Sequence, residues 1–349
     1  MPVERPVLDA WIARKIGLPS GKPPARFDIE AYQLSSLNRS LEHACENSFF
    51  YRKRFGKVKL NSLFELSRLP FTTSEDLREN AMEMLCVNPG QISRIVTLFT
   101  SGSTGKAKRV YFTEDDLALC IDFFHHGMKN LVDRSDAVGI LFPAQRPGSV
   151  GDLLQKGLNR IGCKSFTLYE HSGDFNELYH MLIRNKVTSL AGFPSILTKL
   201  AEYCAVPERA DGLNIKSVLI SADYVSKACR RTVSDTWNPE IYEHYGMTEM
   251  GYGCAVSCAG QLSGSNAFGY HVREADILIE IIDPETGKPV PDGETGEIVF
   301  TTLTRRGMPF IRYKTGDMSG WLNEACPCGS CLKLLKRVGN RGIKKGNHV

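Results

Sequence analysis

Residues 137–142 have the sequence Ala-Val-Gly-Ile-Leu-Phe, an unbroken apolar run that is typical of a strand buried on both faces. Three similar runs follow, at residues 163–169, 189–193 and 217–221. Stretches with helical character separate these runs, around residues 149–161, 174–184, 195–203 and 225–236. Strands that alternate with helices in this way predict an α/β fold with layered, mostly parallel sheets.

The pattern changes after Gly251. Residues 276–282 and 297–303 have strand character, and the turn sequences at 283–287 and 291–296 lie between them. Such turns between alternating strands indicate antiparallel pairing, so we expect a small antiparallel β subdomain beside the α/β body. The predicted domains are an α/β core over residues 1–250, a β-rich subdomain over 251–335 and a basic remnant over 336–349.

The segment before the sheet has helical character. Residues 33–55 place Leu34, Leu37, Leu41 and Ala44 at spacings of three and four, which predicts an amphipathic helix. Capping sequences predict two further helix starts, at residues 73–76 and 113–116.

Composition excludes several classes of protein. The chain has 349 residues and a formal net charge of +4, and six of its 43 basic residues lie between Lys333 and Lys345. The rest of the chain therefore carries no positive field of the kind that nucleic-acid binding needs. No apolar run approaches the length of a membrane-spanning helix, and the first residues do not form a secretory signal. We therefore expect a cytoplasmic protein, without nucleic-acid or membrane partners, whose 11 cysteines are free thiols.

A glycine loop joins two β-like segments, residues 95–99 and 109–112. The loop is Thr100-Ser101-Gly102-Ser103-Thr104-Gly105-Lys106-Ala107-Lys108. Its glycines allow backbone N–H groups to approach an anion, its hydroxyls donate hydrogen bonds and its lysines supply charge, so a polyphosphate is the ligand that fits. The spacing differs from a Walker A loop, and a flexible Ser/Gly hairpin is the alternative.

Two further clusters lie near the C-terminal half. The first runs from Glu243 through Tyr245, Gly246 and Thr248 to Glu249, where the last carboxylate suits Mg²⁺ bound to phosphate and the tyrosine suits a stacked base. In the second, residues 312–317, Asp317 follows a turn glycine and suits a ribose diol. The alternative for each residue taken alone is structural: a surface acid, a core aromatic or a turn aspartate.

The ordered occurrence of these three motifs resembles the adenylate-forming superfamily of acyl-CoA synthetases, adenylation domains and luciferases. The phosphate loop is matched from Ser101 to Lys108, with Ala107 in place of a proline, and the Tyr-Gly-x-Thr-Glu and Tyr-x-Thr-Gly-Asp motifs are matched in full at 245–249 and 313–317. Residues 47–52, 69–73 and 309–313 are similar to the phenylacetate–CoA ligase branch. The resemblance implies the large N-terminal domain of the adenylate-forming fold.

The resemblance also implies roles for individual residues. Thr100, Ser101, Ser103, Thr104 and Lys108, with Gly102 and Gly105 between them, hold the phosphates of ATP. Thr248 touches the α-phosphate and Glu249 binds Mg²⁺, so we take Lys108, Thr248 and Glu249 as the catalytic residues. The nucleoside is expected to contact Ser221, Ala222, Asp223, Glu243, Tyr245, Gly246 and Asp317.

The end of the sequence departs from the superfamily pattern. Arg341 is our match for the hinge arginine, with Arg337 second, but the acidic pair of the hinge and the lysine-bearing C-terminal lid domain are not found. Three explanations stay open: the chain is truncated, it acts without a lid, or a separate lid domain comes from another polypeptide. A homodimer is a further alternative. We expect slow adenylation by the chain alone.

A thiol pair at Cys326 and Cys328, together with Cys258 and His271 upstream, provides the donors of a tetrahedral structural Zn²⁺ site. Members of the resembled branch carry a similar arrangement. Cys254 and Cys331 are reserve ligands, and the alternative is free thiols beside one buried histidine.

The resemblance implies an ATP- and Mg²⁺-dependent ligase that activates a carboxylic acid, of the aryl or arylacetic class, to an acyl-adenylate and then forms a thioester with coenzyme A. One alternative is a nucleotide-binding partner or sensor without turnover. Another is adenylation for a carrier-protein thiol, which shares the first step.

Overall fold

The protein is described here by a computed structural model, which covers residues 7–99, 106–210, 212–259 and 269–339. The chain divides into two units. Unit 1 consists of Met1–Trp11, Leu117–His271 and Cys326–Ser330. Unit 2 consists of Ile12–Asp116, Val272–Ala325 and Cys331–Val349. No helix among the described residues is both long enough and apolar enough to cross a bilayer.

Unit 1 is built on the parallel sheet that the sequence predicts. Its strands are ordered β9-β8-β7-β6-β5-β3-β4, and pairing is parallel from β7 to β4 and antiparallel between β7 and β8. The strands are β3 (Ala137–Leu141), β4 (Lys164–Thr167), β5 (Ser189–Gly192), β6 (Ser217–Ser221), β7 (Glu240–Tyr245), β8 (Ala255–Val256) and β9 (Gly269–Val272). The α/β class is therefore confirmed.

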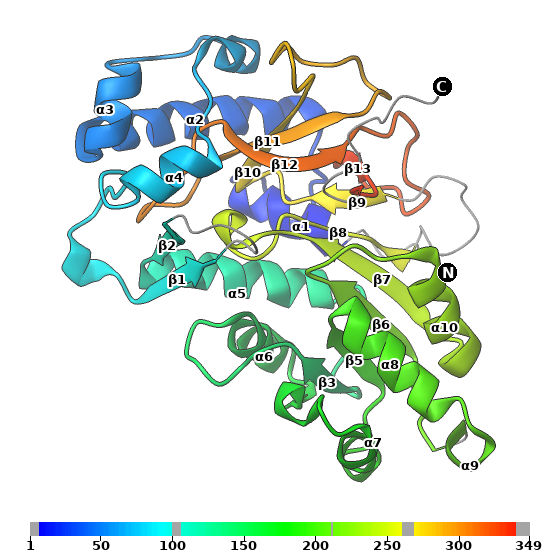
Figure 1. Ribbon diagram of the computed structural model, residues 1–349. Helices are drawn as coiled ribbons and strands as arrows, with labels where there is room; N and C mark the ends of the chain where they lie inside the picture. The colour runs from blue at the N-terminus through cyan, green and yellow to red at the C-terminus, as the bar shows by residue number, and fades with distance from the viewer. Residues whose placement is uncertain (1–6, 100–105, 211, 260–268, 340–349) are drawn as a thin grey trace, which may run out of the picture. The chain divides into compact units, whose positions relative to one another are not determined.

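Helices alternate with the strands of this sheet, as expected (Figure 1). Those lying wholly or mostly in unit 1 are α1 (Val7–Lys15), α5 (Glu114–Met128), α6 (Val150–Ile161), α7 (Phe175–Arg184), α8 (Pro194–Cys204), α9 (Pro207–Ala210) and α10 (Lys227–Trp237). Two short 3₁₀ helices, η3 (Tyr169–His171) and η4 (Thr248–Met250), follow strand ends. Helices α8 and α10 lie side by side over the sheet in Figure 1, and their apolar residues pack on those of β5 and β6 in one buried core.

Unit 2 contains two small antiparallel sheets. Strands β1 (Arg94–Leu98) and β2 (Lys108–Phe112) form a hairpin. A second sheet has the order β10-β11-β12, made of β10 (Ile277–Ile282), β11 (Gly296–Thr302) and β12 (Tyr313–Ser319), which confirms the antiparallel pairing predicted for this region. Unit 2 also contains strand β13 (Leu334–Lys336).

The helices of unit 2 are α2 (Arg26–Asn47), α3 (Phe49–Phe55), α4 (Ser74–Asn80), η1 (Leu63–Arg68) and η2 (Pro89–Gln91). The sequence predicted one helix over residues 33–55, and this prediction is wrong in one respect. The helix breaks at Ser48, whose backbone is extended and whose hydroxyl accepts a hydrogen bond from the Tyr51 N–H while donating to the Glu83 carbonyl. A serine that binds nearby backbone groups ends one helix and caps the next.

The buried side chain of Arg312 holds the β10–β12 sheet to the end of η1 and the residues that follow it. Its guanidinium makes two hydrogen bonds to Glu280 on β10, of 3.0 and 2.8 Å, and also donates to the carbonyls of Ser67 and Leu69. The ring of Phe71 lies 4.1 Å from the guanidinium carbon. Paired in this way, the arginine charge can be buried beside the segment that leads into β12.

Candidate functional site

In unit 1 the carboxyl ends of β6 and β7 carry the predicted nucleoside contacts. The two strands pair in parallel, with Ser221 opposite His244, so the residues that follow each strand emerge at the same edge of the sheet. The Ser221 hydroxyl lies 2.7 Å from Nδ1 of His244 and 3.2 Å from its carbonyl oxygen. This edge is where ligands bind in open parallel sheets.

Residues 222–224 continue from β6 as an exposed segment. Ala222 has a φ of 71°, a left-handed conformation that non-glycine residues rarely adopt. The Asp223 carboxylate accepts a hydrogen bond from the Tyr224 N–H at 2.7 Å, and the Tyr224 ring is exposed. The strained residue and the accessible tyrosine fit a segment shaped to contact a ligand.

The segment after β7 places Glu249 on a short 3₁₀ helix. Gly246 begins the turn, and a Cβ added there would lie 2.3 Å from the Tyr252 carbonyl oxygen, so only glycine fits. Gly251 closes η4 in the left-handed conformation. Tyr245 and Glu249 are both buried, with Glu249 only 1% exposed, whereas Thr248 is half-buried. A carboxylate taken out of bulk water in this way suits binding of a cation.

Glu243 lies two residues before Tyr245 in β7 and is fully buried, at 0% exposure. Its carboxylate forms an ion pair with Arg230 on α10 and accepts a hydrogen bond from the Tyr270 hydroxyl at 3.1 Å. Its backbone N–H donates to the Ser257 hydroxyl. These contacts tie β7 to α10 and β9 and thereby fix the strand that leads into the Tyr245–Glu249 turn.

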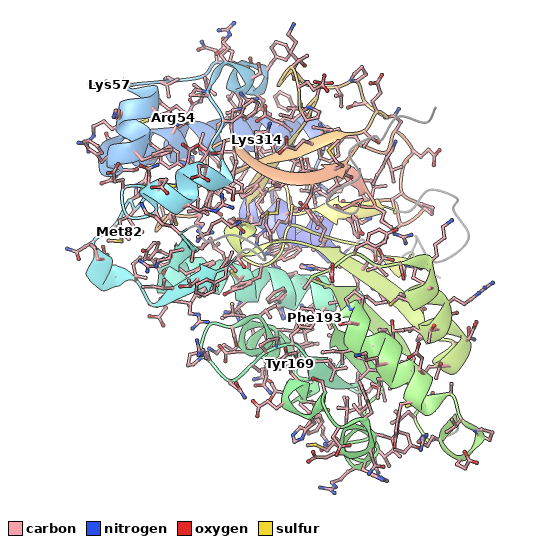
Figure 2. All side chains as sticks on the ribbon, in the orientation of Figure 1. Arg54, Lys57, Met82, Tyr169, Phe193 and Lys314 are labelled. Atoms are coloured by element: carbon pink, nitrogen blue, oxygen red, sulfur yellow. The ribbon has the colours of Figure 1, made fainter. Side chains whose placement is uncertain are left out.

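In unit 2, Asp317 lies beside a β-bulge. The register between β11 and β12 shifts between Glu297 and Val299, opposite a Gly316 with a φ of 76°. The Gly316 N–H donates to the Glu297 carboxylate, which also pairs with Lys314 at 3.0 Å; Lys314 is labelled on this strand in Figure 2. Asp317 itself is 5% exposed, and its N–H donates to the Thr315 hydroxyl. Bulges commonly direct a side chain toward a binding site.

The phosphate-loop prediction is only partly within the described residues. Thr100, Ser101, Gly102, Ser103, Thr104 and Gly105 lie outside them, as does Arg341. The flanking strands β1 and β2 do form the predicted hairpin, with Leu98 opposite Lys108 at the loop end. Lys108 begins β2 and is half-buried, and the exposed Lys106 forms an ion pair with Glu79 at 2.7 Å. Arg337, the second hinge candidate, is half-buried.

Four predicted metal ligands meet in unit 1. The donor atoms of Cys258, His271, Cys326 and Cys328 all lie within 4.8 Å of one another. The Sγ atoms of Cys258 and Cys326 are 3.5 Å apart, and Nε2 of His271 lies 3.3 Å from the Cys258 sulfur and 3.4 Å from the Cys328 sulfur. Tetrahedral Zn²⁺ with bonds of about 2.0 to 2.3 Å places its ligands roughly 3.3 to 3.8 Å apart, which these three distances fit.

Hydrogen bonds within this cluster shift the pKa values of its members in opposite directions. Hydrogen bonding to Cys258 and Cys328 lowers the pKa of the Cys326 thiol, which favours its thiolate. Burial works to lower the pKa of His271, but hydrogen bonds and charges from Cys326 and Cys328 outweigh it and raise that pKa to about 9. The thiolate form is thus favoured at Cys326, whereas the hydrogen bond with Cys326 raises the pKa of the Cys258 thiol, so binding of a metal ion would release protons from Cys258 and His271.

Aromatic side chains follow the carboxyl ends of three neighbouring strands in unit 1. Phe142 follows β3, Tyr169 follows β4 and Phe193 follows β5. The ring of Phe193 lies 5.1 Å from that of Phe142 and 6.0 Å from that of Tyr169, and Figure 2 labels Tyr169 and Phe193. Strand β5 also borders β6, so this aromatic cluster lies along the same edge of the sheet as Ser221.

Sequence reasoning did not identify His244 or the aromatic cluster as parts of this edge. His244 is placed by the register of β6 against β7, and Phe142, Tyr169 and Phe193 are brought together by the strand order β5-β3-β4. Each aromatic directly or closely follows a predicted strand. That position in the sequence is the signal that could have singled them out.

Comparisons with known proteins agree with this arrangement. The family model described as AMP-binding enzyme matches residues 58–303. Phenylacetate-coenzyme A ligase from Thermus thermophilus is 30% identical over 325 residues, which cover 87% of this chain and 68% of the relative. The corresponding ligase from Aromatoleum evansii is 32% identical over 325 residues, covering 90% of this chain and 70% of the relative.

The fold is also found among solved structures. A structure of 2-hydroxyisobutyryl-CoA ligase in complex with 2-HIB-AMP and CoA matches with a TM-score of 0.79 and 23% identity, covering 90% of this chain and 69% of that one. An open conformation of the same ligase matches with a TM-score of 0.78 and 22% identity, covering 91% and 70% of the two chains. At this level of identity the likeness establishes the fold.

Proposed function

The chain belongs to the AMP-binding enzyme family, in its phenylacetate–coenzyme A ligase branch, and from that membership we propose that it activates a carboxylic acid with ATP and transfers the acyl group to coenzyme A. In the first step a carboxylate oxygen attacks the α-phosphorus of ATP, and the bond to the β-phosphate oxygen breaks to release pyrophosphate. In the second step the thiol of coenzyme A attacks the acyl carbon, and AMP leaves. The enzyme is thus an AMP-forming acid–thiol ligase.

The residues after β7 are assigned to the α-phosphate. Negative charge develops on the phosphate oxygens during the first step, and neutralising it lowers the barrier. Mg²⁺ supplies that neutralisation when bound, and the buried Glu249 carboxylate is an oxygen donor of the kind it prefers. Thr248 is assigned to hydrogen bonding with the α-phosphate, and Lys108 to the charge of the departing phosphates.

The nucleoside contacts are assigned by position. Tyr245 and the segment 221–223 border the adenine, Glu243 holds the strand beneath it, and Asp317 binds the ribose diol. The phosphate loop from Thr100 to Gly105 and the hinge residue Arg341 keep the roles that the sequence predicts. The observation that supports this part most strongly is the common edge formed by the ends of β6 and β7.

The acid is assigned to the aryl or arylacetic class. Support comes from the relatives that are phenylacetate–coenzyme A ligases and from the aromatic cluster of Phe142, Tyr169 and Phe193. Aromatic side chains bind a ring through apolar contact and offset or edge-to-face packing. Phe193 and Tyr169 are half-buried, so both retain surface that a ring could cover.

We assign a structural Zn²⁺ ion to Cys258, His271, Cys326 and Cys328. The ligand distances and the lowered pKa of Cys326 support this assignment. Cys258 and His271 border the segment between β8 and β9, so the ion would join this part of unit 1 to Cys326 and Cys328. Such a site stabilises the fold and takes no part in the reaction.

The experiment that tests the proposed function is a screen of aryl and arylacetic acids for AMP, pyrophosphate and acyl-CoA formation, with and without coenzyme A. A nucleotide sensor without turnover would bind ATP and form no AMP with any acid. Transfer to a carrier-protein thiol would give pyrophosphate and acyl-adenylate but no acyl-CoA. Cytoplasmic location and assembly with a second chain or a separate lid domain stay predictions.

A further inference from the structure

A small cationic cleft lies in unit 2, within the described residues. It has a volume of about 130 Å³ and lies between one face of α2 and the segment that follows β11. Helix α2 contributes Ser36, Arg39, Ser40 and His43, which are three or four residues apart and so share one face of the helix. The other wall consists of residues 303–306, and no lining residue is acidic. We call it the Arg39–Arg306 cleft.

Two carboxylates, of Asp116 and Asp276, hold the wall after β11 in place by accepting hydrogen bonds from its residues. The Asp116 carboxylate accepts hydrogen bonds from the N–H groups of Arg306 and Gly307, at 3.0 and 3.1 Å. Asp276 accepts from the Thr304 hydroxyl at 2.8 Å and pairs with Lys15. These two carboxylates fix the wall, and neither lines the cleft.

His43 joins the two walls. Its Nε2 atom lies 3.0 Å from the Arg306 carbonyl oxygen, and its Nδ1 atom lies 3.2 Å from the Asn47 amide nitrogen. The amide can only donate, so Nδ1 accepts and the ring proton sits on Nε2, where it is donated to the carbonyl. The imidazole therefore positions the Arg306 backbone, and the charge of the cleft comes from its arginines.

Two of the three arginines that line the cleft are exposed, and the third is buried. The Arg39 guanidinium is held by the hydroxyls of Ser35 and Ser36, at 3.0 and 2.8 Å. Arg305 is buried, stacks on the Phe112 ring at 4.3 Å and donates to the Tyr111 carbonyl. Arg39 and Arg306 are exposed, and neither forms an ion pair with any residue that the structure describes. The cleft is thus lined by three arginines, of which Arg39 and Arg306 are exposed, and by no carboxylate.

We propose that the Arg39–Arg306 cleft binds a phosphate group, either inorganic phosphate or the monoester of a larger molecule. Its volume corresponds to about four water molecules, which is room for a phosphate and little more. Guanidinium groups bind phosphate oxygens through paired, charge-assisted hydrogen bonds. A phosphate dianion would balance the charge that the cleft concentrates.

This cleft is separate from the proposed loop for the phosphates of ATP. Arg305 contacts Tyr111 and Phe112 at one end of β2, whereas the loop adjoins Lys108 at the other end. Four residue steps along the strand separate Lys108 from Phe112, a distance of roughly 13 Å. The inference therefore goes beyond the proposed function and does not depend on it, except where coenzyme A is used as a probe below.

The test is calorimetric titration of the full 349-residue chain with sodium phosphate at constant ionic strength. We expect one saturable site, with Arg39→Gln and Arg306→Gln each weakening the affinity roughly tenfold and the double variant binding no phosphate. Arg39→Lys keeps the charge but loses the paired geometry, so its affinity for phosphate should lie between those of the unmodified chain and Arg39→Gln. Arg184→Gln, at an exposed arginine of α7, is the matched control and binds like the unmodified chain.

A second arm identifies the source of the phosphate. Coenzyme A and dephospho-coenzyme A differ only in one phosphate monoester, so their affinities are compared in the unmodified chain and in the double variant. If the double variant binds the two molecules with equal affinity, having lost only the preference for coenzyme A, the cleft binds that monoester. If the double variant binds coenzyme A and dephospho-coenzyme A as the unmodified chain does but no longer binds inorganic phosphate, the ligand is free phosphate. Unaltered thermal unfolding shows that the variants fold. The proposal is overturned if the double variant retains both phosphate binding and the preference for coenzyme A, or if the unmodified chain has neither.

Discussion

The hydroxyl of Ser221 and Nδ1 of His244 lie 2.7 Å apart, at the ends of two parallel neighbouring strands. The contact links the residue before the strained Ala222 to the residue before Tyr245. The rings of Phe123 and Phe124 lie against His244, with centroids 5.8 and 6.0 Å away. This hydrogen bond and these two aromatic contacts therefore help to hold the edge proposed to bind the nucleoside.

Replacing Ser221 with alanine removes that hydrogen bond. We expect Ser221→Ala to lower the free energy of unfolding by about 1 kcal/mol and to lower kcat/KM for the acid about tenfold, because the His244 ring loses its fixed orientation. Ser217→Ala is the control, since Ser217 lies at the other end of β6 and bonds to Ser189 at 2.8 Å. Chemical denaturation and steady-state kinetics measure both effects. Equal kinetic losses in the two variants would refute a role for the Ser221–His244 pair.

Glu249→Gln keeps the shape of the side chain and removes its charge. We expect pyrophosphate release to fall by roughly 10²- to 10³-fold, because the variant loses a ligand for Mg²⁺ where phosphate charge develops. The loss should be largest at low Mg²⁺ concentration. Glu240→Gln, at the exposed start of β7, is the control and should leave the rate unchanged. A Glu249→Gln enzyme with normal activity at limiting Mg²⁺ would remove Glu249 from the metal site.

Phe193→Ala tests the aromatic cluster. The truncation removes a ring that packs against Phe142 and Tyr169, so we expect KM for an arylacetic acid to rise about tenfold while KM for ATP stays the same. Phe175→Ala in α7 is the control, because the Phe175 ring packs on the apolar core of unit 1 and against Tyr203 of α8. If both variants change KM for the acid alike, the cluster is only part of the packing.

Metal analysis tests the Cys/His cluster. Protein purified without added metal should contain one Zn²⁺ per chain, and Cys326→Ser should lose the ion and unfold at a lower temperature. Cys331→Ser is the control, since Cys331 lies near Cys328 in the sequence but its sulfur is directed to the Pro24 carbonyl. Absence of zinc from the unmodified protein, or its retention by Cys326→Ser, would contradict the assignment.

Much of the fold was predictable because each signal is local. The apolar runs at residues 137–142 and 217–221 give the strands β3 and β6, and the turn sequences at 283–287 and 291–296 give the antiparallel sheet. The break at Ser48 was missed because the prediction followed the helical spacing past a serine that caps the next helix through the Tyr51 N–H.

The site was predictable to a smaller extent. Spacing alone could not decide whether Cys258, His271, Cys326 and Cys328 lie together or are separate. In the structure their donor atoms meet because β9 and residues 326–328 approach each other. The Ser221–His244 pair depends on strand register, and the ion pair of Glu243 with Arg230 depends on how α10 packs. None of these relationships is encoded in a single segment, so motif matching could name the residues but not their partners.

The most direct test of the central claim is the joint measurement of AMP, pyrophosphate and acyl-CoA when the purified chain is given ATP, Mg²⁺, coenzyme A and phenylacetate or a related aryl acid. We expect all three products to form in equal amounts and none to form without the acid. Binding of ATP without acid-dependent AMP for any aryl or arylacetic acid would contradict it.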